Sequence, residues 1–566
     1  MDVSSLPGST GGGTLASRGG GGAGDSAKGG DTFDNPIGNI CCNVLTLICC
    51  CCCAPFLIVS FLILYLLGLI TIVTPTPPDM TFEKWAAVCD APLCADVAKE
   101  IFGKGGAIGD AAVATLLCMG VTAPHLTGIG GGLMAILYNK ATMKVQALDA
   151  LGVSPKSITE DMFSSNASAL KLGANAVIVP GALAGMQALH NVTGKLPWKD
   201  VFQPAIRIAR DGFTIGPNLA AALANNMIVL NLSPALRKRF SNNATGALLQ
   251  SGDKLVQTQL ADLLTKLAEE GAEYLYEKEL AEEIEANVAS AGGSLKASDL
   301  SDYKPLWQDP VSAKMGGSQR LYSAPIPGAG VVLAVAVHQI KVNFVEDLKF
   351  ALARRPELGD DEDVKSKQAD MVTEAIGFAD QNRDKTKPLA SAQSYGIKHS
   401  PEEDFGGAQL TIVAPSGDAV SITSGMNGIF GSGFEAPSGL LLNNYMDAFA
   451  KTGKPFGLDP SPVNKLAPGK RPMTSMLITC LRMYALPHCV WNDTRVQPTF
   501  RSTTPNAVFA EHKSTHFDPA HLLRKLGYSV TEKVITSAAT GIAVLKTGLL
   551  LAPNDTKHVD GSRSGE

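Results

Sequence analysis

The pattern of apolar and polar positions changes several times along the 566-residue chain. Leu45–Val73 is one apolar run without a charged residue, and it is long enough to span a bilayer as a helix. Gly109–Val121 is apolar around most of its circumference, which predicts a buried helix. Asp200–Asp299 has apolar positions at helical spacing with acidic positions between them, which predicts helices with one solvated face.

A β-hairpin is predicted in the C-terminal half. Gly407–Val413 and Ala419–Ser424 are short apolar or β-branched runs on either side of a Pro/Gly/Asp turn. A tight turn between them places Gly407 opposite Gly425. The segment that follows, Asn427–Gly433, has three glycines in seven residues, so its backbone can approach a ligand closely. On the residues alone, this stretch is a core hairpin followed by a flexible turn.

Short motifs along the chain occur in the order in which they are found in a known family. They are Gly105–Ala112, Ala123-Pro124-His125, Gly128–Gly132, Leu196-Pro197-Trp198, Ala209–Phe213, Phe430-Gly431-Ser432, Asn443-Asn444, Met446-Asp447 and Pro468–Met476. Between about residues 86 and 476 the chain resembles the γ-glutamyltransferase (glutathione hydrolase) family of N-terminal-nucleophile hydrolases. The resemblance implies an α/β (α+β) fold, the four-layer αββα sandwich of that superfamily.

The resemblance also implies a chemistry. In the family the precursor cuts itself in front of a threonine, and the threonine hydroxyl then attacks the γ-glutamyl carbonyl of glutathione or a related amide. Gly407 stands at that position and has no side chain, so it cannot supply the nucleophile. Thr411 lies roughly 13 Å further along the strand, which is too far. Thr423, opposite Gln409 in the hairpin, would lack the α-amine that serves as the base.

Positions that the family uses around the substrate divide into two groups. Those that differ are Leu151 for the arginine that binds the α-carboxylate, Gly425 for a supporting threonine, and Tyr445 and Ala448 for groups that bind the α-amine. Those that are retained are Asn427, Thr474 and Ser475. After Leu477 the family's Gly-Gly oxyanion turn is also missing, through divergence or through a gene model that skipped an exon.

These differences predict a catalytically degenerate member that stays a single uncut chain, a pseudoenzyme with a binding or regulatory role. The alternative is an active glutathione hydrolase or γ-glutamyl transferase with another nucleophile, and a third interpretation is a mispredicted transcript of a real enzyme. Glutathione or another γ-glutamyl compound and an active relative are the expected partners. No cofactor or metal ion is expected, and the net charge of -5 argues against nucleic acid.

The chain is expected to have four regions. Residues 1–39 are a Gly/Ser-rich tail that we expect to be disordered, and residues 40–75 hold the apolar span, which is too long and starts too late for a cleavable signal peptide. Residues 76–403 resemble the large subunit of the family, and residues 404–566 resemble the small subunit, with divergence after 477.

Six glycosylation sequons all follow the apolar span. Their acceptors are Asn166, Asn191, Asn231, Asn243, Asn492 and Asn554. Together with the resemblance, they favour a single-pass type II membrane protein, a glycoprotein with its C-terminal part in the lumen or outside the cell. We expect it at the plasma membrane or in the secretory pathway, with the apolar span as its signal anchor.

Seven of the twelve cysteines, Cys41, Cys42 and Cys49–Cys53, crowd the start of the span. They are candidates for palmitoylation, or they pack as small apolar residues within a helix. In the ectodomain, Cys94 and Cys118 resemble the bonded pair of the family. Cys89 is left over, and Cys480 and Cys489 could pair with each other.

Overall fold

The computed structural model describes residues 81–566 with gaps, all within the second of two units, Thr76–Glu566. The gaps are residues 164–165, 316–318, 340–343, 385–387, 403–406, 452–453, 455–456, 477, 484–485, 489–491, 494–506, 512–528, 534–538, 541, 545–549 and 552–561. The predicted tail and membrane span, residues 1–75, lie outside the described residues. In the part of the chain that is described, no helix is both long enough and apolar enough to cross a membrane.

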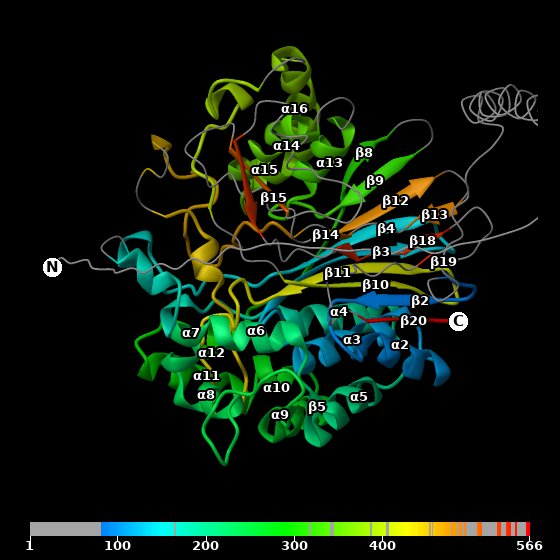
Figure 1. Ribbon diagram of the computed structural model, residues 1–566, viewed down its shortest axis with the longest axis vertical. Coiled ribbons are helices and arrows are strands. Elements are labelled where there is room, and N and C mark those ends of the chain that lie inside the picture. The colour runs from blue at the N-terminus through cyan, green and yellow to red at the C-terminus, as the bar shows by residue number, and fades with distance from the viewer. Residues whose placement is uncertain are drawn as a thin grey trace, which may run out of the picture. The chain divides into compact units, whose positions relative to one another are not determined.

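The largest sheet has seven strands, and every strand is antiparallel to its neighbours. Across the sheet they are β20 (Ser562–Gly565), β2 (Ala86–Cys89), β10 (Ala408–Val413), β11 (Ala419–Gly425), β3 (Gly132–Asn139), β4 (Lys144–Ala150) and β7 (Leu306–Gln308). The predicted hairpin is β10 and β11, and it lies inside the sheet between β2 and β3 (Figure 1).

A second sheet of four strands lies next to the first (Figure 1). Its order is β13 (Leu486–His488), β12 (Thr479–Met483), β9 (Arg320–Ser323) and β8 (Val311–Lys314). The shorter sheets are β1 (Thr81–Phe82) with β19 (Leu550–Leu551) and β18 (Ala543–Val544), β5 (Phe213–Thr214) with β6 (Lys254–Leu255), β14 (Asn492–Asp493) with β17 (Ala539–Thr540), and β15 (Ala507–Glu511) with β16 (Ser529–Lys533).

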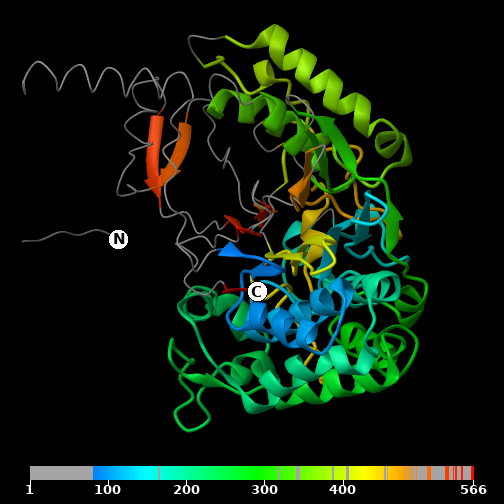
Figure 2. The same cartoon turned by 90° about the vertical axis from the view of Figure 1, so that its right-hand side faces the viewer.

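The helices form two groups, one on each outer side of the paired sheets (Figures 1 and 2). On the side of the seven-stranded sheet are α2 (Cys94–Gly103), α3 (Ile108–Thr122), α4 (Ala182–Thr193), α5 (Trp198–Asp211), α6 (Pro217–Asn225), α7 (Met227–Leu232), α8 (Pro234–Arg239), α9 (Thr258–Glu270), α10 (Glu273–Tyr276), α11 (Glu279–Ser290) and α12 (Ala297–Ser301). On the side of the second sheet are α13 (Gly330–Gln339), α14 (Phe344–Leu352), α15 (Glu362–Ser366) and α16 (Gln368–Asn382). The predicted buried helix is α3, and all of its residues except Gly120 are buried.

Apolar side chains pack between successive layers because neighbouring residues of a strand point to opposite faces of a sheet. Leu410 and Ile412 of β10 pack with the helices around α3. Met134 and Ile136 of β3 pack on the other face, in a cluster that reaches Cys480 of the second sheet. A third cluster joins the second sheet to α13 and α16. The layers therefore follow the order helix, sheet, sheet, helix, as the resemblance implied.

The register of the central hairpin is as predicted. Val413 is paired with Ala419, and Gln409 with Thr423. The side chains of the second pair also meet, because Gln409 Nε2 donates a hydrogen bond of 2.8 Å to Thr423 Oγ1. Continued by one pair, the same register brings Gly407 beside Gly425.

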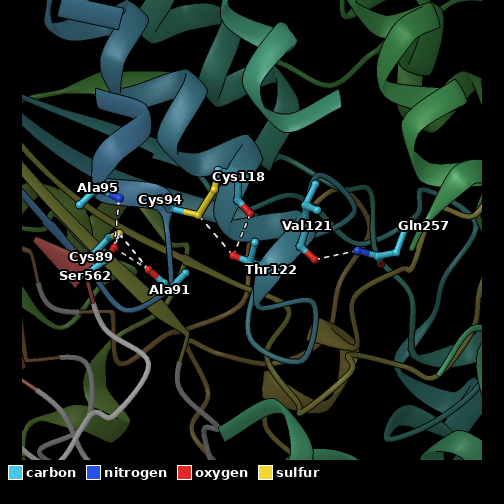
Figure 3. Close-up of a disulfide and its surroundings, with 9 residues drawn as sticks. All are labelled: Cys89, Ala91, Cys94, Ala95, Cys118, Val121, Thr122, Gln257 and Ser562. Atoms are coloured by element: carbon cyan, nitrogen blue, oxygen red, sulfur yellow. Dashed lines mark hydrogen bonds between the residues drawn. A yellow bond between two sulfur atoms is a disulfide. The ribbon is translucent and has the colours of Figure 1, made fainter. Parts of the chain in front are cut away.

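A disulfide joins Cys94 and Cys118, and so links α2 to α3 (Figure 3). Thr122 lies next to it, with its Oγ1 atom 3.2 Å from Cys94 Sγ. The C-terminal strand also holds α2, because Ser562 Oγ accepts a hydrogen bond of 3.1 Å from the Ala95 amide near the start of the helix. The first two helices are therefore fixed to each other and to the sheet edge.

Replacing both Cys94 and Cys118 with alanine should destabilise the folded chain by about 3 kcal/mol, because the cross-link closes a loop whose ends are 24 residues apart. Thermal unfolding of the full-length protein measures the loss. A reductant should lower the melting temperature of the native protein and leave that of the double variant unchanged. Cys89→Ala is the control and should keep the response to reductant, so an unresponsive native protein would contradict the assignment.

Asp110 connects α3 to the loop between α4 and α5. Its carboxylate accepts hydrogen bonds from the backbone amides of Ala107, Lys195 and Leu196, at 2.7–3.2 Å. His190 Nε2 lies 3.2 Å from the same carboxylate. Burial raises the pKa of Asp110, but the hydrogen bonds of His190 and the amides lower it below its usual value. The hydrogen bond to Asp110 in turn raises the pKa of His190.

The free energy of unfolding should fall with pH above neutrality because of this pair. A raised folded-state pKa means that His190 stabilises the fold fully below about pH 6.5, and that this contribution is lost as the pH rises through the raised pKa. At about pH 5.5 we expect His190→Gln to cost about 1 kcal/mol, and less at pH 9. Urea unfolding at both pH values measures the difference. Asp110→Asn should remove the pH dependence of that difference, and its persistence would contradict the pairing.

Candidate functional site

Gly407 lies just before β10, and it is buried beside the end of β11. A β-carbon added to Gly407 would lie 2.7 Å from the carbonyl oxygen of Ser424 and 3.3 Å from the α-carbon of Gly425. The first of these distances is too short for a carbon and an oxygen that are not bonded. A side chain therefore fits at Gly407 only if the neighbouring backbone moves.

That neighbouring backbone is held in place. Ser424 Oγ accepts a hydrogen bond of 2.6 Å from Thr127 and donates one of 3.2 Å to the carbonyl of Gly132. On the far side, a β-carbon added to Gly131 would lie 2.2 Å from the carbonyl oxygen of Gly425. On both sides of the end of β11, the neighbouring backbones are thus too close to leave room for a β-carbon.

Neither threonine weighed as a substitute nucleophile is accessible. Thr423 is fully buried, and its hydroxyl is bound to Gln409. Thr411 is 2% exposed and is paired with Ser421 inside the sheet. Both side chains are part of the sheet interior, so a substrate carbonyl could reach them only if the sheet opened.

Three positions that contact the substrate in the resembled family are occupied by core residues. Leu151, Tyr445 and Ala448 are between 0% and 2% exposed, and they belong to the apolar cluster between the two sheets. Tyr445 and Ala448 are the first and last residues of the short 3-10 helix η7 (Tyr445–Ala448). These positions, for which the resemblance implies charged and polar groups, are therefore part of an apolar cluster in this chain.

A buried carboxylate, Asp149, and a buried guanidinium, Arg471, lie close to Leu151. The Leu151 amide donates a hydrogen bond of 3.1 Å to Asp149, and the carboxylate of Asp149 lies 3.4 Å from Arg471 Nε. Burial raises the pKa of Asp149, and the nearby charge of Arg471 opposes that rise. Another guanidinium nitrogen of Arg471 donates a hydrogen bond of 2.8 Å to the carbonyl of Lys304. This arginine is therefore committed to contacts within the protein.

Asn427 and Asn444 join the glycine-rich turn to the segment that follows it, and Asn443 joins that segment to the loop before β3. Asn427 has a φ of 69°, and its Nδ2 donates a hydrogen bond of 3.1 Å to the carbonyl of Asn444. Asn444 Oδ1 accepts one of 2.6 Å from the Gly428 amide. Asn443 Nδ2 donates to the carbonyl of Gly130 at 2.9 Å. Within the described residues, Asn427 Oδ1 has no hydrogen-bond partner, but the atom is buried, so a ligand could reach it only if the surrounding residues moved.

The retained hydroxyl residues lie on the segment that enters the second sheet. Thr474 is buried, and its amide donates a hydrogen bond of 3.1 Å to the carbonyl of Pro327. Ser475 Oγ accepts a hydrogen bond of 2.7 Å from Arg355 Nε. A ligand carboxylate that used Ser475 would have to share it with this guanidinium.

Arg355 also binds the segment that leads into Gly407. Its Nη1 donates to the backbone carbonyl of Glu402, which is five residues before Gly407. The carboxylate of Glu402 lies 3.3 Å from Lys451 Nζ, and the same ammonium lies 3.0 Å from Asp447. Burial raises the pKa of Glu402, and the charge of Lys451 opposes that rise. These contacts hold the chain just upstream of the site.

The chain is similar in sequence to known proteins. Residues 94–488 match the family model described as Gamma-glutamyltranspeptidase. The chain belongs to the γ-glutamyltranspeptidase family. The relatives include scoloptoxin SSD14 of Scolopendra dehaani, which is 34% identical over an alignment of 418 residues, with 70% of this chain and 72% of the relative covered. They also include glutathione hydrolase 5 proenzyme of Rattus norvegicus, 31% identical over an alignment of 430 residues, with 71% of this chain and 74% of the relative covered.

Solved structures share the fold. Cephalosporin acylase from Bacillus halodurans superposes with a TM-score of 0.72 and 22% identity, over 88% of this chain and 98% of that chain. At this identity the likeness concerns the arrangement of sheets and helices only.

The contacts that surround Ser475 and the segment before Gly407 could not be predicted from the sequence. Arg355, Glu402 and Lys451 carry no periodic or motif signal, and they are brought together only by the fold. The order of motifs located Gly407, Gly425 and the retained residues, but gave no sign that an arginine binds Ser475.

The remaining predicted positions are partly described. Asn166, Asn191, Asn231 and Asn243 are exposed, as glycosylation requires, whereas Asn554 and the exposure of Asn492 lie outside the described residues. Cys89 and Cys480 are buried thiols. Cys489 lies outside the described residues, so its pairing with Cys480 stays a prediction.

Replacing Lys451 with methionine should loosen the segment before Gly407. The change removes the cation between two largely buried carboxylates, and a loss of about 1.4 kcal/mol from the local opening free energy would raise protease cleavage there about tenfold. Limited proteolysis with mass spectrometry of the new ends measures the rate. Lys454→Met is the control, because Lys454 pairs with Asp459 where both side chains are about two-thirds exposed. Equal cleavage rates in the two variants would show that the contacts of Lys451 with Glu402 and Asp447 do not hold this segment.

Proposed function

We propose that this chain is a membrane-anchored member of the γ-glutamyltranspeptidase family that has lost hydrolase and transferase activity and acts by binding or regulation. The observation that carries the proposal is the buried Gly407, where an added β-carbon would lie 2.7 Å from the Ser424 carbonyl oxygen. Both self-cleavage and attack on a γ-glutamyl carbonyl need an oxygen nucleophile at this position.

Two further features support the proposal. Leu151, Tyr445 and Ala448 fill the positions of the substrate clamps with buried apolar contacts. Glu402, five residues before Gly407, is bound through its carbonyl by Arg355 and through its carboxylate by Lys451. The relative from Rattus norvegicus is named a proenzyme, a precursor, whereas we expect this chain to remain uncut.

The proposed role uses what is left of the site and the surface around it. Asn427, Thr474 and Ser475 are retained, so binding of glutathione or another γ-glutamyl compound is part of the proposed role, although Asn427 Oδ1 is buried and a ligand amine could bond to it only after neighbouring residues moved. Binding to an active relative fits a chain that keeps the family fold without its nucleophile. The apolar run 45–73 would anchor the protein as a type II ectoprotein at the plasma membrane or in the secretory pathway.

The full-length protein should migrate as one polypeptide and release no product from a γ-glutamyl anilide above the rate of a protein-free blank. Gly407→Thr should not restore turnover, because the clamp positions stay apolar, and it should destabilise the fold by about 1–3 kcal/mol through overpacking. Denaturing gels, N-terminal sequencing and steady-state assays beside an active relative measure these outcomes.

An active enzyme would give a different result. Two polypeptides whose new N-terminus is a hydroxyl-bearing residue, or turnover that exceeds that of a protein-free blank, would overturn the proposal. Sequencing of the transcript across residues 477–494 tests the exon-skipping interpretation separately, since a corrected C-terminal part would not change Gly407 or Leu151.

A further inference from the structure

A surface groove of about 360 Å³ is formed by helices α4, α5 and α9, within the helical layer beside the seven-stranded sheet (Figure 1). This volume is in the range of small-ligand sites in proteins. Its lining combines the partly exposed indole of Trp198 with the side chains of Gln187, Asn191, Lys199 and Glu269. None of the residues named at the hydrolase site lines it.

The aromatic wall of the groove is fixed in advance. Trp198 Nε1 donates a hydrogen bond of 3.0 Å to the carbonyl of Leu267. The ring of His190 meets that of Trp198 edge to face with centroids 5.2 Å apart, and His190 is itself held by Asp110. A ligand would therefore find the indole already oriented, which lowers the entropy cost of binding.

This lining suits a sugar. A pyranose ring has an apolar C–H face that packs on an indole, and hydroxyl groups at its edge that bond to amide, ammonium and carboxylate groups. Asn191 both lines the groove and is the acceptor of the sequon Asn191-Val192-Thr193. We propose that Asn191 carries an N-linked glycan whose first sugars lie in this groove against Trp198.

The attachment follows ordinary chemistry for a secretory chain. A bond forms between Asn191 Nδ2 and C1 of the first sugar. The bond from C1 to the diphosphate of a lipid-linked oligosaccharide donor breaks, and the amide proton leaves with the diphosphate. Transfer takes place on the nascent chain before α4 folds, so the helical position of Asn191 does not oppose it.

The inference rests on the lumenal or extracellular orientation proposed above, but not on the loss of catalysis. Asn166 and Asn243 provide non-helical controls, because both are exposed sequon acceptors and neither lines the groove. Asn231, an exposed acceptor within α7 that also lies outside the groove, shows how much a helical position alone slows release. A glycan packed in the groove must leave it before an amidase can reach the sugar–asparagine bond. Glycans at the two control positions need no such step.

The experiment uses the full-length protein from glycosylating cells, purified in detergent. Glycopeptide mass spectrometry gives the occupancy of each acceptor, and peptide N-glycosidase then releases the glycans from the native and the denatured protein. We expect release from native Asn191 to be about tenfold slower than from Asn166 and Asn243, as a contact worth about 1.4 kcal/mol would give. Denaturation should make the three rates equal.

Trp198→Ala should bring the native release rate at Asn191 up to that of the controls. If this variant fails to fold, the double change Lys199→Ala and Glu269→Ala removes exposed polar partners and should raise the rate in part. If Asn166 and Asn243 carry glycans and Asn191 carries none, or if the native release rates at the three positions are equal, the proposal of a glycan in the groove is wrong. The lumenal or extracellular orientation would still stand. Three unoccupied acceptors would overturn the orientation, and the inference with it.

Discussion

The close approach of β10 and β11 at Gly407 is the constraint on which the rest of the site depends. The carbonyl of Ser424 occupies the space that a β-carbon at Gly407 would need, and hydrogen bonds to Thr127 and Gly132 fix the backbone there. A side chain at Gly407 would therefore require the backbone at the end of β11 to move. Gly425 also packs closely against the backbone of Gly131 on its other side. A shift of β11 that made room for a side chain at Gly407 would therefore also displace the backbone at Gly131.

The surrounding residues are consistent with that constraint. Positions that would hold a charged substrate are filled by Leu151, Tyr445 and Ala448, whose burial contributes to the cluster between the two sheets. The charged groups that remain nearby serve the fold, because Arg355 and Lys451 bind the segment that precedes β10.

Much of this was readable from sequence for a physical reason. Hairpin register follows from side-chain alternation and turn length, so the pairing of Gln409 with Thr423 could be predicted. The buried helix α3 could be predicted because its apolar residues surround the axis. The contacts of Arg355 could not, because a loop arginine has no period, and its partners lie far along the chain.

The sequence by itself determined the absence of a hydroxyl at Gly407, because this depends on residue identity alone. Its ordered motifs carried the resemblance from which the family and the order of the layers were expected. Only the tertiary structure decided that the position is also sterically closed, that the clamp positions form part of the core, and that Asn191 borders a groove with Trp198. The reason is that steric room and burial are properties of segments brought together by folding. Distances between such segments are not encoded in any one stretch of the chain.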